Sequence, residues 1–158
     1  MNKKQLRKSE IKELNDLINS NYSSFFNFNK KDNVEVVKTD DFKLVLLDNE
    51  VVFLYYNDLI IPSLKFILKN NNLPIKRIAV DMGAVKFVTS GADIMRPGIV
   101  DIDDGINEKD IVIVVDENNK KPLAVCLALF NSDKLKEMTT GKVLKNIHYV
   151  GDKIWNYE

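Results

Sequence analysis

The sequence is poor in the residues that build disulfides, metal sites and imidazole-based active sites. It contains one cysteine, Cys126, and one histidine, His148. A disulfide needs two cysteines, so none can form within the chain, which fits a reducing compartment. A zinc site takes about four ligands, drawn mostly from Cys and His. We therefore expect a protein without cofactor, without metal and without catalysis.

An excess of one charge sign is missing too, because 23 Lys and Arg residues balance 23 Asp and Glu residues. Bulk charge thus gives no support to nucleic-acid binding, and any such site must be a local patch. No apolar run approaches the roughly 20 residues of a membrane helix. The charged start, residues 1–13, is not followed by the apolar segment of a signal peptide. We expect a soluble, cytoplasmic protein.

Periodicity in the first half predicts an α+β domain that opens with an amphipathic helix over residues 3–20. Its apolar positions fall near one face, and they are Leu6, Ile11, Leu14, Leu17 and Ile18. An aromatic cluster follows, made of Tyr22, Phe25, Phe26 and Phe28. Such a cluster can stack nucleic-acid bases, but more often it fastens a helix to a sheet, and we favour the second interpretation.

Strands are predicted after the helix, at residues 34–37, and as a hairpin of residues 42–47 and 51–56 around Asp48-Asn49-Glu50. Pro62 is expected to open a helix over residues 63–68, because proline suits a first helical turn. The run Asn70 to Asn72, followed by Pro74, reads as a linker. We place a domain boundary there, so the N-terminal domain covers residues 1–74, and we assign it to docking.

Short strands dominate the second half, which predicts a small, partly open β-barrel over residues 75–158. Strands are expected at residues 77–80, 92–95, 111–115, 123–130, 147–150 and 153–155. One helix is expected over residues 83–90, closed by Gly91 in a left-handed conformation. A second is expected to start at Ser132 as its N-cap and to end near Gly141.

Three apparent motifs in this half do not hold up. Asp101, Asp103 and Asp104 resemble a calcium loop, but the glycine and the closing glutamate are out of register. Gly141-Lys142 ends like a phosphate loop without its first glycine or its Ser/Thr. His148 lies in a predicted strand without a visible catalytic partner, which favours a structural histidine.

The stretch from Ala79 to Ile99 carries more information. Its glycines, Gly91 and Gly98, let backbone N–H groups approach a ligand without an intervening Cβ. Lys86 and Arg96 flank this backbone, and together these groups could hold phosphates. The alternative is that the glycines simply form tight turns of a small barrel, and spacing alone favours this alternative.

The pattern Gly83-Ala84, Gly91-Ala92 and Pro97-Gly98 resembles the opening of a PUA domain. The whole chain is similar to the malignant T-cell amplified sequence proteins and their archaeal relatives. The segment from Val80-Asp81 to Gly98, the segment Asn146 to Tyr149, and Asp152 with Trp155 carry this resemblance. It implies a small N-terminal α+β domain followed by a C-terminal PUA-type β-barrel.

The resemblance also implies non-catalytic binding of tRNA, at its 3′ end, or of rRNA in translation initiation or ribosome recycling. Implied partners are the small ribosomal subunit and a density-regulated-protein-like protein. The expected RNA-binding residues are Lys86, Ser90, Gly91, Ala92, Asp93, Met95, Arg96, Pro97, Gly98, Lys142, His148 and Tyr149. Two alternatives stay open: a module that delivers RNA to a modification enzyme, and a protein–protein adaptor that does not bind RNA.

Overall fold

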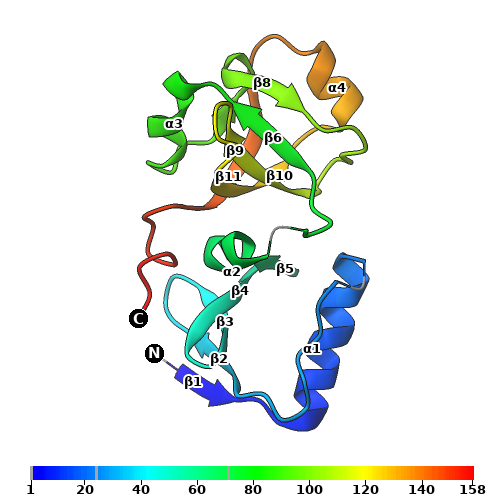
Figure 1. The fold of residues 1–158 in the computed structure, drawn as a ribbon, viewed down its shortest axis with the longest axis vertical. Coiled ribbons are helices and arrows are strands. Elements are labelled where there is room, and N and C mark those ends of the chain that lie inside the picture. The colour runs from blue at the N-terminus through cyan, green and yellow to red at the C-terminus, as the bar shows by residue number, and fades with distance from the viewer. Residues whose placement is uncertain (1, 24, 71) are drawn as a thin grey trace. The chain divides into compact units, whose positions relative to one another are not determined.

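The computed structural model describes residues 2–23, 25–70 and 72–158 (Figure 1). The chain divides into two compact units. The N-terminal unit comprises Met1–Pro74 with Tyr157–Glu158, and the C-terminal unit comprises Ile75–Asn156. Each unit has its own sheet and its own hydrophobic core, so each is described by itself.

The N-terminal unit is an antiparallel sheet with the strand order β1-β2-β3-β4-β5 and two helices. Its elements are β1 (Asn2–Gln5), α1 (Lys8–Asn21), β2 (Val34–Lys38), β3 (Lys43–Leu47), β4 (Glu50–Tyr56), β5 (Leu59–Pro62) and α2 (Leu64–Lys69). Every strand pairs with its neighbour in sequence, and α1 is inserted between β1 and β2.

The first predicted helix is wrong at its start. Residues 2–5 form β1, which pairs with β2 from Asn2↔Lys38 to Gln5↔Glu35. The helix begins at Lys8, where the Glu10 carboxylate accepts a hydrogen bond from the Arg7 N–H at 3.0 Å. Its expected apolar face is confirmed, because Ile11, Leu14 and Ile18 are buried.

The aromatic cluster fastens α1 to the sheet, as the structural interpretation predicted. Phe28 is buried in the core, and Tyr22, Phe25 and Phe26 pack against that core. The Phe26 ring lies 5.7 Å from the Phe53 ring, centroid to centroid. The Tyr22 hydroxyl donates to the Ile60 carbonyl oxygen at 2.6 Å, which ties the cluster to the edge strand β5.

The hairpin between β3 and β4 is confirmed. Asp48 and Asn49 have φ angles of 49° and 70°, the left-handed pair that a tight two-residue turn requires. Pro62 does not open a helix, because it closes β5. Ser63 is the N-cap of α2 instead, and its side chain accepts from the Phe66 N–H at 3.1 Å. The predicted linker contains Asn71, which lies outside the described residues.

The C-terminal unit is a strongly curved mixed sheet with the order β7-β11-β10-β9-β6-β8. Its elements are β6 (Arg77–Val80), α3 (Met82–Val88), β7 (Ile94–Met95), the 3₁₀ helix η1 (Arg96–Gly98), β8 (Ile99–Ile102), β9 (Ile111–Asp116), β10 (Pro122–Ala128), α4 (Ser132–Glu137) and β11 (Lys142–Tyr149). The pair β6–β9 is parallel, and the other pairs are antiparallel. The predicted α+β class with a C-terminal barrel is confirmed.

Three predicted elements of this unit need correction, two strands and one helix. The pair of strands at 147–150 and 153–155 is replaced by one long strand, β11, followed by turns. Helix α4 ends at Glu137, and its N-cap is Asn131, whose side chain accepts from the Lys134 N–H at 2.8 Å. Ser132 is buried, accepts from the Ile106 N–H and donates to the Asp103 carbonyl, both at 2.8 Å.

Candidate functional site

Helix α3 is short, and a hydrogen-bonded cap limits it at each end. Asp81 follows β6 and accepts from the Ala84 N–H at 2.8 Å. At the other end, the Ala92 N–H donates to the Phe87 carbonyl at 3.1 Å, and Gly91 between them has a φ of +93°. The predicted left-handed conformation of Gly91 is thus confirmed.

The close neighbour of Gly91 is a side chain of the same unit. A Cβ atom on Gly91 would lie 2.9 Å from Cε1 of Tyr149 and 3.0 Å from its hydroxyl oxygen. The half-buried Tyr149 ring therefore occupies the space that the missing side chain leaves. Gly98 has a similar role, because a Cβ there would lie 3.2 Å from the Cβ of Ala84 and would push α3 away from η1.

These close approaches leave an apolar cavity between α3 and the segment from Ala92 to Gly98, here called the α3–β7 cleft. Its volume is about 340 Å³. The residues that line it are Gly83, Ala84, Phe87, Val88, Ala92, Asp93, Ile94, Met95 and Gly98. Phe87 is 58% exposed and Met95 is 51% exposed, although both are large apolar side chains. Such exposure next to a hollow is typical of a surface that binds a ligand.

Asp93 lies beside two lysines of β11 at the strand side of this cleft. Its carboxylate accepts from the Asn146 N–H at 2.9 Å and lies 3.4 Å from the Lys142 ammonium and 3.7 Å from that of Lys145. Partial burial raises the pKa of Asp93, but the Asn146 N–H and the two lysines outweigh it, so the pKa lies below its ordinary value. Asp93 is therefore a carboxylate that holds two cations beside the cleft.

Asn146 fixes the loop that forms the end of the cleft. Its side-chain amide donates to the carbonyl oxygens of Val88 and Ala92, at 3.0 Å each. The first carbonyl ends α3 and the second precedes β7. The amide thereby clamps the Gly91 turn onto β11.

Arg96 has less freedom than its position in the sequence suggests. Its Nε donates to the Leu135 carbonyl at 2.7 Å, and its Nη1 donates to the Ile99 carbonyl at 3.2 Å. Its backbone N–H donates to the Gly141 carbonyl at 2.8 Å. These contacts tie η1 to α4 and β8, so Arg96 serves the fold first.

The other predicted cation and its neighbours lie at the surface. Lys86 is exposed, and its ammonium lies 5.1 Å from the centroid of the Phe87 ring. Ser90 is exposed as well, and its hydroxyl donates to the Lys86 carbonyl at 2.6 Å. Pro97 is exposed in η1. The Lys86 side chain is therefore free to contact a phosphate, whereas the Arg96 side chain is held by its two carbonyl partners.

His148 lies in the interior of the C-terminal unit. It is 1% exposed, and its Nδ1 lies 2.8 Å from Oδ2 of Asp152. Asp152 also accepts from the N–H groups of Tyr149 and Trp155, at 3.0 and 2.8 Å. The structural interpretation of His148 holds, and the ring has no surface on which a base could stack.

The acidic loop that resembled a calcium site is held by other contacts. Asp103 accepts from the Arg77 N–H at 2.7 Å, and Asp104 forms an ion pair with Lys136. The described residues contain no group of three or more His, Cys, Asp or Glu side chains placed to hold a metal ion. Within residues 2–23, 25–70 and 72–158, no helix has the length and hydropathy of a membrane span.

Comparison with known families accounts for both units. Residues 76–150 match the family described as "PUA domain", and residues 2–70 match "Domain of unknown function (DUF1947)". Translation machinery-associated protein 20 of Saccharomyces cerevisiae is 34% identical over 135 residues, which are 81% of this chain and 74% of the yeast protein. The malignant T-cell-amplified sequence 1 homolog of Dictyostelium discoideum is 30% identical over 134 residues, 77% of this chain and 69% of that protein.

The chain belongs to the malignant T-cell-amplified sequence family. An uncharacterized protein of Methanocaldococcus jannaschii is 53% identical over 130 residues, 82% of this chain and 79% of that protein. A hypothetical protein of Pyrococcus horikoshii has the same fold, with a TM-score of 0.82, 36% identity and 98% of each chain covered. The resemblance seen in the sequence is therefore confirmed.

The predicted site residues of this family member did not include Phe87, which lines the cleft, or Lys145 and Asn146, which lie beside it. A signal existed for Phe87, because Gly83 and Phe87 are four residues apart and share one helical face. Lys145 and Asn146 lie three and four residues after Lys142, so an alternating strand would place Asn146 on the face of Lys142 and Lys145 on the opposite face. Their role depends on the pairing of β11 with β7, which no local pattern shows.

Proposed function

We propose that this protein is a non-catalytic RNA-binding protein of translation, and that the α3–β7 cleft holds an unpaired 3′ end of tRNA or an exposed segment of rRNA. The family supports the general role, since one relative bears the name translation machinery-associated protein. The PUA match covers the unit that contains the cleft. The finer assignment rests on the chemistry of the cleft.

The observation that carries the proposal is the pair of exposed apolar side chains, Phe87 and Met95, beside an apolar hollow. A base offers a flat apolar face, and its stacking on an aromatic ring contributes about 1–3 kcal/mol. Specific RNA recognition uses unstacked, single-stranded bases of this kind. An end of RNA therefore fits this surface better than a duplex does.

Cations near the cleft suit the backbone of such a segment. Lys86 lies on α3, and Lys142 and Lys145 lie on β11 beside Asp93. Asp93 sets the positions of the two β11 lysines and offsets part of their charge. A small number of phosphate contacts follows, which agrees with the zero net charge of the chain.

The test compares Phe87→Ala with a matched control, Val100→Ala. Val100 is 50% exposed on β8 and does not line the cleft. Loss of one stacked base predicts a roughly 5- to 150-fold rise in the Kd for tRNA in Phe87→Ala. Val100→Ala should bind as the wild type does.

A second arm uses tRNA with and without its 3′ CCA. Weaker binding of the trimmed tRNA supports recognition of the 3′ end. Equal binding of both forms, together with an effect of Phe87→Ala, favours the delivery of RNA to a modification enzyme. Absence of binding to any RNA leaves the protein–protein adaptor, and the proposed function is then wrong.

For the N-terminal unit, we propose docking to the small ribosomal subunit or to a density-regulated-protein-like partner. Residues 2–70 match a family without a stated activity, so the assignment rests on the division of the chain into two units. Residues 75–158 alone should keep RNA affinity and lose association with the small subunit. Retained association of that fragment would contradict this assignment.

A further inference from the structure

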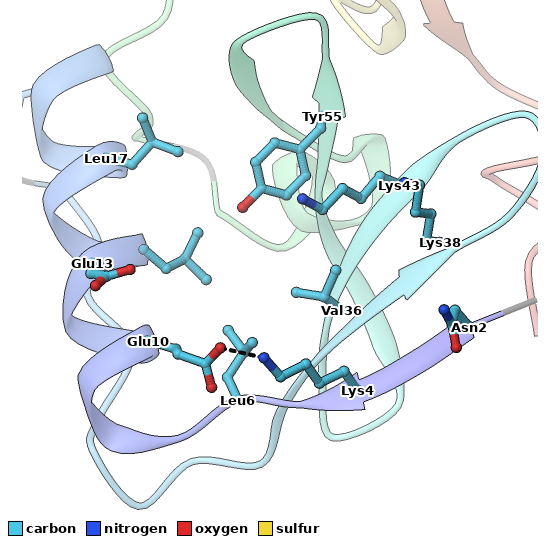
Figure 2. Close-up of a pocket in the computed structure, with 11 residues that line it drawn as sticks. Asn2, Lys4, Leu6, Glu10, Glu13, Leu17, Val36, Lys38, Lys43 and Tyr55 are labelled. Atoms are coloured by element: carbon cyan, nitrogen blue, oxygen red, sulfur yellow. Dashed lines mark hydrogen bonds and ion pairs between the residues drawn. The ribbon is translucent and has the colours of Figure 1, made fainter.

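A groove of about 560 Å³ lies in the N-terminal unit between α1 and one face of the sheet (Figure 2). Its floor is apolar and consists of Leu6, Leu14, Leu17, Val36 and the ring of Tyr55. Its polar rim consists of Asn2, Lys4, Glu10, Glu13, Lys38 and Lys43. This size and this mixture are those of small-molecule sites, which have apolar walls with a few convergent polar groups.

The strand register places two lysines directly opposite each other at one end of the groove. Lys38 of β2 pairs with Lys43 of β3, and Lys43 pairs in turn with Tyr55 of β4. Like charges at directly opposed positions destabilise a sheet. Among the described residues, no carboxylate forms an ion pair with Lys38. A bound anion would remove this repulsion.

Tyr55 adds a hydrogen-bond donor at the same end. Figure 2 shows its hydroxyl and the Lys43 ammonium pointing into the space between helix and sheet. The ammonium lies 4.4 Å from the centroid of the Tyr55 ring. Burial raises the pKa of Tyr55, so the hydroxyl keeps its proton and remains a donor at neutral pH.

The opposite end of the groove carries carboxylates from α1, one of which is paired with a lysine. Lys4 of β1 reaches across to Glu10 of α1 at 2.6 Å, so this end is closed by an ion pair (Figure 2). Glu13, one turn further along α1, adds a carboxylate to the helix wall. A ligand with one negative group would thus be oriented, with that group at Lys38 and Lys43 and away from the helix.

We infer that the groove binds a small organic acid with one apolar arm. Its carboxylate is held by Lys38, Lys43 and the Tyr55 hydroxyl, and its apolar arm lies on Leu14, Leu17 and Val36. The lysine pair and the floor are both needed, because an acid without the arm leaves the floor in water. This site is separate from the α3–β7 cleft, so its test does not depend on RNA binding.

The test is an NMR titration of the full-length protein with 3-phenylpropionate, an acid of this class. From its size we expect a Kd of roughly 1 mM. Shift changes should concentrate on the methyl groups of Leu14, Leu17 and Val36. The neutral 3-phenylpropionamide and the armless acetate should each bind at least about tenfold more weakly.

Variants distinguish specific binding of the carboxylate from nonspecific hydrophobic binding. Lys43→Gln and Tyr55→Phe should each weaken 3-phenylpropionate, and Lys43→Gln should bring its affinity close to that of the amide. Lys12→Gln removes an exposed lysine of α1 outside the groove and should change nothing. Cooperative thermal unfolding shows that the variants fold.

Two outcomes would overturn the inference. Equal affinity for the acid and the amide would mean that the lysine pair does not select an anion. Absence of shift changes at the floor methyl groups with about 10 mM 3-phenylpropionate, well above the expected Kd, would mean that the groove is not a ligand site.

Discussion

Replacement of Gly91 by alanine tests the turn on which the α3–β7 cleft depends. The residue has a φ of +93°, and a left-handed conformation costs a non-glycine residue about 1–2 kcal/mol. The new Cβ would also lie 2.9–3.0 Å from three atoms of the Tyr149 side chain. Crowding of that kind typically costs a further 1–3 kcal/mol. The expected loss is therefore about 2–5 kcal/mol.

Gly141 and Gly151 supply controls for the cost of the left-handed backbone conformation alone. Their φ angles are +94° and +92°, and a Cβ on either would meet no atom within 4 Å. Gly141→Ala and Gly151→Ala should thus lose about 1–2 kcal/mol each. The difference from Gly91→Ala isolates the contact with Tyr149.

The assay is urea unfolding followed by tryptophan fluorescence. Trp155 is the single tryptophan of the chain and belongs to the C-terminal unit, so its signal reports on the correct unit. In the Tyr149→Ala background, Gly91→Ala should cost no more than the two control glycines. Equal losses for Gly91→Ala and Gly141→Ala in the wild-type background would refute the reasoning.

Four further predictions follow from single contacts. Ser132→Ala should lower the free energy of unfolding by about 1–3 kcal/mol, because it leaves the buried Ile106 N–H without its acceptor, and the N-cap variant Asn131→Ala should lower it by about 1 kcal/mol. A larger loss for Asn131→Ala than for Ser132→Ala in urea unfolding would contradict the assignment of the cap. The Lys4 ammonium and the Arg7 N–H lower the pKa of Glu10 from 4.5 to about 2, so the stability that the ionised carboxylate adds to the protein is complete above pH 4.5 and disappears as the pH falls toward 2. Glu10→Gln should therefore make the free energy of unfolding depend less on pH between 2 and 4.5, and a Glu10 carboxyl that titrates near pH 4.5 by NMR would contradict this. Lys38→Thr should raise the stability of the N-terminal unit by about 0.2–1 kcal/mol at low salt and by less at high salt, as thermal unfolding would show; a loss at low salt would mean that the opposed lysines do not repel. Lys86→Gln should flatten the slope of log K for tRNA against log salt by about 0.7, whereas Arg96→Lys should lower the melting temperature and leave that slope unchanged.

Local chemistry made part of the fold predictable. Asp48-Asn49 tolerates the left-handed angles of a two-residue turn, so the hairpin could be placed from the sequence. Gly91 could be assigned a positive φ for the same kind of reason. In each case the signal and the structure lie within a few residues of each other.

Strands whose partners are distant were less predictable. Residues 2–5 are exposed and polar, and they become β1 through pairing with Val34–Lys38 beyond the helix. In β11, Val143 and Leu144 are both buried, and the register shifts against β7 and β10. These shifts break the alternation by which a strand is recognised, so the long strand was missed.

The candidate site shows the same division. Gly91 and Gly98 mark the cleft because a positive φ at the first and a close approach to Ala84 at the second favour glycine. The roles of the side chains do not follow from such marks. Arg96 was predicted to bind phosphate, and its guanidinium donates to the Leu135 carbonyl of the distant α4 and to the Ile99 carbonyl three residues away. Phe87 was not among the predicted site residues, and it is largely exposed beside the cleft.

The two sheets differ in how far apart in sequence their partners lie, and this sets an order of folding. In the N-terminal unit every strand pairs with the next one along the chain, so its sheet can grow by local hairpins. In the C-terminal unit β7 can pair only after β11 has been made, and β6 can form its parallel pairing only after β9 has been made. Loop closure over such distances slows folding. During synthesis the sheet of the N-terminal unit can therefore be complete while β6 still lacks β9 and β7 still lacks β11, and β7 presents an unpaired strand edge until β11 has been added.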